Sequence, residues 1–486
     1  TYTYSHWAFD IVIYIIHNIW GFTGLYVGTI IFAIITNVVL FNLLNERSKS
    51  PIVALLTTLI LTYFIRGCFT ARSQIVSFVC FIIEIYAIEK LIETGKKRYI
   101  IILCLLSVII ANFHAATWPL FLVLFLPYIG AAFLKAVLPK SIYIAMKNRA
   151  EKKLKKGIKD PKKVKKYEED VKYYSKFAEE IKPIDYQKIT IRENYNVKIL
   201  IITMIIICFT GLLTPIHDVP YTYIVKSMLG TSNFENNASV DFVAEMQPII
   251  PMTNIAILVF MILFIAFFTF TPAKIKLEHG FLVLGLLFMT LTSVRYVYLL
   301  VFLGAYVLAD LITQNVNKYL KKEIEIVEEV CGSALIVIIL IISVSAFSIY
   351  ELIQKKEEKY INEETYPVEA TEYIKNNLDY KNMRIFNSYD NGSYLMLNEI
   401  PVFIDSRLDV YCSEFNDTDV FYDYIQASTG KVHYEDVFTK NNFTHILIKN
   451  ENVINKYIEK DNNYKRIYED ENYTIYERNV DKSSAK

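Results

Sequence analysis

The sequence predicts a polytopic α-helical membrane protein of about ten spans with an extracytoplasmic α/β domain at its C-terminus. The first observation is composition, since 53% of the 486 residues are hydrophobic and the mean hydropathy is +0.30. The second is that the charged residues, 21% of the chain, are segregated along it. A chain this apolar is unusual for a soluble protein, so its apolar segments are expected to cross a bilayer.

Charge divides the chain into regions of opposite sign. Residues 135–198 contain 19 Lys or Arg and 9 Asp or Glu, whereas residues 351–486 contain 17 and 26. The Lys-rich region is interpreted as a solvated cytoplasmic helical hairpin held near anionic lipid, and nucleic acid is not expected as a partner. The near-neutral total of +1 indicates nothing about partners.

Ten apolar segments are candidates for spans, because roughly 20 apolar residues are needed to cross the hydrocarbon. They are 22–44, 51–66, 75–92, 99–113, 117–134, 199–213, 253–271, 277–293, 296–313 and 332–350. Segment 7–19 is too short to span, contains Asp10 and His17, and is predicted to be an interfacial helix that ends at Gly21. The chain begins at Thr1 without Met, and we expect a preceding piece that includes a further membrane helix.

The orientation follows from basic residues, which mark cytoplasmic loops. Every odd-numbered span is followed by such a loop, with Arg47, Lys49, Lys96, Lys97, Arg98, Lys274, Lys276, Lys318, Lys321 and Lys322 outside the Lys-rich region. The predicted organisation is a first membrane part at 1–134, a cytoplasmic insert at 135–198, a second membrane part at 199–350 and an extracytoplasmic domain at 351–486. No internal repeat is visible, although many secondary transporters contain one.

The C-terminal domain shows the alternation of a layered α/β fold. Thr365 is predicted to cap a helix, and apolar runs at 383–386, 402–404 and 445–448 are predicted to lie in the sheet. Helices are expected near 417–427 and 451–460, and the final YKRIYEDENYTIYER is typical of a β-hairpin. The segments 387–393 and 405–411 each follow an apolar run and are predicted to be neighbouring loops.

Polar and ionisable residues are concentrated at the predicted outer ends of the spans. Placing ionisable side chains at this depth costs free energy, so such residues usually have a functional role. They are His6, Asp10, Arg66, Arg72, Asn112, His114, Trp118, His217, Asp218, Glu245, Gln247 and Arg295. Arginine suits the forked binding of phosphate oxygens, so the set predicts a site for an anionic lipid. Each member also has an ordinary alternative, such as an interfacial anchor or a bond to a neighbouring helix. No Cys/His cluster with zinc spacing is visible, so no metal site is predicted.

Several of these stretches, taken in order, resemble integral-membrane glycosyltransferases of the GT-C superfamily, which includes protein mannosyltransferases, aminoarabinose transferases and oligosaccharyltransferase catalytic subunits. They are SHWAFDIVIYIIHNIWGFTGLYVG, ARSQIVSFVCFIIEIYAIEK, ANFHAATWPLFLVL, TPIHDVPYTYIVKSMLGTSN, VAEMQP and SVRYVYLLVF. The segment from Pro367 to Tyr411 is similar to the outer domain of related members. YDNG in it lacks both Trp residues of the oligosaccharyltransferase WWDYG motif.

The resemblance implies transfer of a sugar from a polyprenyl-phosphate donor to a glycan or protein acceptor at the outer face of a cell membrane. The catalytic acid of this superfamily would precede Thr1, and Asp10 and Glu245 are the catalytic candidates within the chain. Arg66, Arg72, His114 and Arg295 are expected to bind the donor phosphate. His217, Asp218, Asp390, Asp405 and Arg407 are expected to position the acceptor.

Other functions fit the same pattern. A lipid-linked oligosaccharide polymerase or ligase would use the outer arginines without a strict need for a carboxylate base. A transporter or flippase is a second alternative, and an envelope scaffold whose outer domain binds polymer is a third. No cofactor is assigned, and a role for a divalent cation is left open. The sequence contains neither a DxD motif in a nucleotide-sugar context nor a Gly-rich phosphate loop, which disfavours soluble nucleotide sugars as donors.

Overall fold

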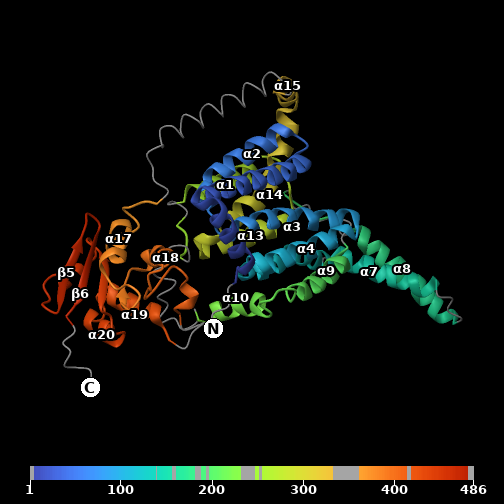
Figure 1. Cartoon of the computed structure of the whole chain (residues 1–486). Coiled ribbons are helices and arrows are strands. Elements are labelled where there is room, and N and C mark those ends of the chain that lie inside the picture. Colours follow the sequence, from blue (N-terminus) through green and yellow to red (C-terminus); the bar gives the residue numbers. More distant parts are fainter. Residues whose placement is uncertain are drawn as a thin grey trace. The chain divides into compact units, whose positions relative to one another are not determined.

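The computed structural model describes residues 5–137, 139–155, 160–180, 188–192, 196–230, 247–250, 254–331, 361–412 and 418–479. It separates into two compact units (Figure 1). The helical unit comprises Thr3–Ile224 and Gln247–Val337. The C-terminal unit comprises Thr1–Tyr2, Val225–Met246 and Ile338–Lys486.

Helices occupy nine of the ten predicted apolar segments, and the tenth, 332–350, lies outside the described residues. The helices up to the end of the insert are α1 (Trp7–Ser48), α2 (Pro51–Phe64), η1 (Arg66–Cys68), α3 (Gln74–Thr94), α4 (Arg98–Phe113), η2 (Ala115–Thr117), α5 (Trp118–Val123), α6 (Leu126–Val137), α7 (Pro139–Lys155) and α8 (Pro161–Glu180). Those that follow are α9 (Val197–Thr210), α10 (Val219–Gly230), α12 (Ile255–Phe270), α13 (Leu277–Thr292), η5 (Val294–Tyr296), α14 (Val297–Tyr319) and α15 (Lys321–Cys331). Two short strands, β1 (Ile189–Thr190) and β2 (Ile275–Lys276), pair in parallel.

Three helices in the described part of the chain are long and apolar enough to cross a membrane. They span Trp7–Ser48, Ala115–Val137 and Val294–Tyr319, and five shorter apolar helices accompany them. Large side chains on their surfaces are apolar, such as Ile202 and Phe270, which is the pattern of a lipid-facing surface. The structure therefore indicates a membrane protein, while the number of about ten spans stays a prediction.

Helix α14 forms the centre of the helical unit. Of the residues in its most apolar stretch, 83% are buried, against 22% for α1. It packs against α1, α2, α3, α12 and α13. A helix that is apolar around its whole circumference is stable only when neighbours surround it, or lipid does. The turns between the surrounding helices lie at the two ends of this core, and polar residues of these turns lie there too.

The predicted surface helix and the first span form the single run α1, which is broken at Gly21. This residue has φ 59° and ψ −151°, outside the helical region. A glycine tolerates this positive φ, whereas other residues are strained there. Gly21 thus separates the segment that carries Asp10 from the long apolar part of α1, as the sequence predicts.

The C-terminal unit contains a four-stranded mixed sheet in the order β3-β4-β6-β5. Its strands are β3 (Ile385–Phe386), β4 (His445–Lys449), β5 (Tyr464–Glu469) and β6 (Tyr473–Arg478). Its helices are α17 (Val368–Asn377), α18 (Tyr389–Leu397), η6 (Leu408–Val410), α19 (Val420–Ser428), α20 (Tyr434–Lys440) and α21 (Asn455–Ile458). Strands β5 and β6 form the antiparallel hairpin that the sequence predicts.

Helices cover both faces of this sheet because side chains alternate along its strands. Leu447 and Ile475 pack with α17 and α18 on one face. Ile446 and Tyr476 pack with α20 on the other, around Phe438. The unit is an α/β layered structure, and its side of the membrane stays a prediction.

Three local predictions for the C-terminal unit are wrong. Thr365 does not cap α17; its carbonyl accepts a bond from the Tyr473 hydroxyl at 2.5 Å instead. Segment 402–404 forms no strand, because the buried Asn387 side chain takes the place of a partner strand, accepting from the Phe403 amide and donating to the Ile404 carbonyl. Residues 389–393 belong to α18 rather than to a loop.

Gly392 allows α18 to lie directly against the backbone of residues 404–405. A Cβ at this position would lie 2.0 Å from the Ile404 carbonyl oxygen and 2.7 Å from the Asp405 Cα. The sequence Asp-Asn-Gly therefore serves close helix packing at this position, whereas its usual role is in a turn.

Candidate functional site

One end of the helical unit brings together four chain segments around His114. This residue follows the last turn of α4, where φ −154° and ψ 63° end the helix before η2. Its side chain is 7% exposed, and its Nδ1 lies 2.8 Å from the Ser77 Oγ of α3. The Ala115 amide donates to the Ser5 carbonyl at 2.7 Å, which fixes the start of the chain to the same place.

Two basic side chains lie near this imidazole. Arg295, in the η5 turn between α13 and α14, and His6 both lie within electrostatic range of His114. The His6 Nε2 lies 3.6 Å from the Asp10 Oδ1, one turn along α1. We call His6, Asp10, Ser77, His114 and Arg295 the His114 cluster. It contains two predicted phosphate ligands and the predicted base Asp10.

The other predicted residues of the membrane part are placed as follows. Arg66 is exposed, lies over the Tyr63 ring at 4.3 Å and donates to the Tyr63 carbonyl. Arg72 is exposed in the loop before α3, and His217 and Asp218 are exposed in the turn before α10. Glu245 lies outside the described residues. The prediction that Arg72 lines one cavity with His114 and Arg295 stays untested.

An apolar cavity opens beside Arg66. It has a volume of about 690 Å³ and is lined by Asn37, Leu59, Ile60, Thr62, Tyr63 and Phe64. The Thr62 hydroxyl donates to the Asn37 Oδ1 at 2.6 Å, so the polar atoms of the wall satisfy each other. The cavity between α1 and α2 is therefore apolar, with a cation next to its wall at Tyr63.

In the C-terminal unit the two segments predicted to be neighbours do lie side by side. The Ser393 and Ser406 hydroxyls are 2.7 Å apart, and the Tyr389 hydroxyl donates to the Ser406 carbonyl. Asp390 is exposed in the first turn of α18. Asp405 is buried and bound by Arg407 at 2.6 and 2.9 Å.

The Asp405 carboxylate also accepts a bond from the Tyr411 hydroxyl at 2.6 Å. Burial alone would raise the pKa of Asp405, but the bonds from Arg407 and Tyr411 outweigh it and hold the pKa below the ordinary value. Burial and the bond to Asp405 raise the pKa of Tyr411. Asp405 thus organises its own segment, and Asp390 and Arg407 are the more accessible members of the predicted acceptor site.

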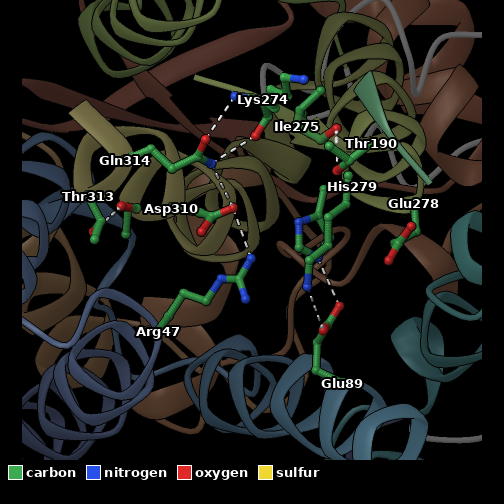
Figure 2. Close-up of polar contacts among 12 residues, drawn as sticks. Arg47, Glu89, Thr190, Lys274, Ile275, Glu278, His279, Asp310, Thr313 and Gln314 are labelled. Carbon is green, nitrogen blue, oxygen red and sulfur yellow. Dashed lines mark hydrogen bonds and ion pairs between the residues drawn. The ribbon is translucent and has the colours of Figure 1, made fainter. Parts of the chain in front are cut away.

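The opposite end of the helical unit contains a charged cluster that the sequence does not predict, and Figure 2 shows its members Glu89, Glu278 and His279. Glu89 of α3 accepts bonds from His279 at 2.9 Å and from Arg192 at 2.7 Å. Arg192, which follows β1, also donates to Glu278 of α13 at 2.9 Å. Glu89, Glu278 and His279 are buried. We call Glu89, Arg192, Glu278 and His279 the Glu89 cluster.

The basic loops around it belong to the ends that the sequence assigns to the cytoplasm. Arg47 at the end of α1 pairs with Asp310 of α14 at 2.9 Å (Figure 2). The Gln314 side chain bonds both backbone groups of Lys274 at 2.8 Å and so fixes the loop that leads to β2. A signal was present in the sequence, because Glu89 and Glu278 lie at the ends of predicted spans, but their partner Arg192 lies in the insert.

The Glu89 cluster also offers ligand atoms for a cation. Glu89, Glu278 and His279 each present one such atom, all within 4.8 Å of one another. Arg192 already neutralises both carboxylates, however, and a divalent cation would have to displace it. The arrangement is accounted for as an ion-pair network that fixes the end of the insert to the bundle.

No protein-family model matches the chain, and no curated protein matches it. Its function is therefore inferred from its own residues and geometry.

Proposed function

We propose that the protein is a membrane glycosyltransferase that moves a sugar from a polyprenyl-phosphate donor to an acceptor outside the cytoplasm. The observation that carries the proposal is the convergence of His6, Asp10, His114 and Arg295 from segments far apart in the sequence. Cationic and imidazole groups beside a carboxylate are the set that such a transfer needs. The resemblance to GT-C enzymes supports the same reading.

In the proposed reaction, Arg295 binds the donor phosphate and stabilises the negative charge that develops as the C1–O bond breaks. Asp10 accepts the proton of the attacking hydroxyl, as a general base. His6, 3.6 Å from Asp10, orients that carboxylate. Glu245 remains the second candidate base within the chain.

The apolar cavity between α1 and α2 offers a place for the lipid chain. Four of its six lining residues are aliphatic or aromatic, and Arg66 lies over the ring of its wall residue Tyr63. An isoprenoid already lies in the hydrocarbon of the bilayer, so such a cavity binds it through van der Waals packing and not through the removal of apolar area from water. Arg66 then meets the phosphate where the lipid leaves the cavity.

The test measures binding of a radiolabelled polyprenyl-phosphate sugar to the purified full chain in nanodiscs. Arg295→Gln is expected to weaken binding roughly 10-fold to 150-fold, because a charge-assisted bond contributes about 1.5–3 kcal/mol. Arg98→Gln is the matched control, since Arg98 is an exposed cation that bonds the neighbouring Tyr99 at the start of α4. Unchanged binding by Arg295→Gln would remove the basis of the proposal.

A second measurement separates a transferase from a polymerase or ligase. Asp10→Asn keeps the shape of the side chain and removes its basicity. In a transferase that uses Asp10, this variant binds the donor and loses transfer by roughly 100-fold or more. Full transfer by both Asp10→Asn and Glu245→Gln would favour a polymerase or ligase that needs no carboxylate in this chain.

A further inference from the structure

Glu84 is a carboxyl group that neither the predicted site nor the Glu89 cluster uses. It lies in the middle of α3, and its residue is 0% exposed. Both of its carboxyl oxygens are buried without a hydrogen-bond partner within the described part of the chain. Within the described residues, no Lys, Arg or His lies within ion-pair distance of this carboxyl to compensate a negative charge.

The surroundings of Glu84 are apolar. Phe81, Ile85 and Ile88 on the same helix are buried, and α3 packs against α1, α4 and α14. Among the described residues, the Cys80 thiol, one helical turn earlier, is a titratable group that interacts electrostatically with Glu84. An isolated ionised carboxylate in such surroundings is strongly disfavoured, so the neutral acid is the form that this packing accommodates.

Glu89 on the same helix shows the opposite solution. Its carboxylate is also buried but is compensated by His279 and Arg192 at less than 3 Å, with Lys276 at 3.9 Å. The two carboxyl groups lie five residues apart on α3, and the described residues give charged partners to Glu89 but not to Glu84. Glu89 can stay ionised, whereas Glu84 needs a proton.

The position of Glu84 connects it to the His114 cluster. Ser77, which contacts His114, lies seven residues earlier, and seven residues complete almost two turns of a helix. Ser77 and Glu84 consequently share one face of α3, with Glu84 about 10 Å deeper along the helix axis. Cys80 lies between them on the same face.

We propose that Glu84 is a proton-binding site inside the helical unit, beneath the His114 cluster. The carboxylate takes up one proton from water when the chain folds and holds it as the acid. This proposal does not depend on the proposed glycosyl transfer.

Carbodiimide labelling tests the proposal directly. Dicyclohexylcarbodiimide is apolar and enters the bilayer. A protonated carboxyl adds across one C=N bond of the reagent to give an O-acylisourea, and migration of the acyl group from oxygen to nitrogen then gives a stable N-acylurea, with no leaving group. After treatment of the full chain in nanodiscs at neutral pH, mass spectrometry is expected to find the adduct on Glu84 and not on the paired Glu89. An adduct on Glu89 with Glu84 unmodified would overturn the proposal.

Thermal unfolding of Glu84→Gln gives an independent readout, because glutamine resembles the neutral acid and cannot ionise. If folding requires proton uptake, the wild-type chain loses stability relative to Glu84→Gln as pH rises from 5 to 8, by up to roughly tenfold in the unfolding equilibrium constant per pH unit. Glu89→Gln is the matched control and is expected to destabilise the chain, because it leaves Arg192 undercompensated. A Glu84→Gln variant that is less stable than wild type, with the deficit growing as pH rises, would show an ionised and paired Glu84 and refute the proposal.

Discussion

Replacing Arg192 with methionine tests whether the Glu89 cluster holds the insert onto the helical unit. Arg192 donates to Glu89 and Glu278, whose side chains are 3% and 1% exposed. Methionine keeps much of the apolar stem and removes the charge. Glu89 retains His279 and Lys276 after this change, whereas Glu278 loses the only ion-pair partner within 4 Å that the described residues give it.

The expected loss is large because a buried carboxylate is left uncompensated. Removing one partner of a buried pair costs about 3–5 kcal/mol, far more than the ~0–1 kcal/mol of an exposed pair. Glu278 also lies in the first turn of α13, where the helix dipole favours an anion and offsets a small part of the loss. We therefore expect the melting temperature to fall by about 5–8 °C.

Thermal unfolding in detergent, followed by the loss of the monomeric peak in size-exclusion chromatography, measures this change. Lys163→Met is the matched control, because Lys163 is exposed and its nearest carboxylate, on Asp160, is 4.0 Å away. The double variant Arg192→Met/Glu278→Gln should recover about 1–3 kcal/mol, since it removes the stranded charge. A single Arg192→Met variant that melts within about 2 °C of the control would refute the reasoning.

Three further outcomes are expected. Gly392→Ala should destabilise the C-terminal unit by about 1–3 kcal/mol in denaturant unfolding, because the new methyl collides with a backbone carbonyl, and an unchanged midpoint would contradict the packing. The pKa of Asp405 is lower in the folded chain than in the unfolded chain, so its ionised form stabilises the fold at pH values above the ordinary aspartate pKa of about 3.9. The free energy of unfolding should therefore fall as pH drops below this value. Arg407→Met should make this fall smaller when unfolding is measured in an acid titration. An impermeant thiol reagent on intact cells should label Val432→Cys and spare Lys163→Cys, both at exposed positions, and the reverse pattern would invert the predicted orientation.

The helical segments of the membrane part and the position of the last hairpin can be predicted from the sequence. Hydropathy and alternation are local properties, so α4, α9, α12 and α13 fall close to their predicted bounds. The strands β5 and β6 alternate as a short hairpin should, with a polar turn between them. These features depend on neighbours a few residues away, which the sequence shows directly.

Four of the five residues of the His114 cluster, all except Ser77, can be anticipated in the same way. His114 and Arg295 each interrupt an apolar run at the same predicted depth, and both lie within electrostatic range of one another. Arg66 also interrupts an apolar run at this depth, but it lies beside an apolar cavity and bonds its own neighbour Tyr63. Depth along the membrane normal is readable from the sequence, whereas the direction of a side chain around the helix axis depends on which helices pack there.

The pairing of distant charges and the surroundings of buried ones depend on how the chain folds. Arg192 is 103 residues from Glu89 and 86 from Glu278, and no local pattern links them. Likewise, Glu84 and Glu89 are both glutamates within one apolar helix, yet one is fully paired and the other has no described partner. The difference arises because the free energy of a buried charge is set by the groups within a few ångströms of it, and in this fold those groups come from segments far away in the sequence.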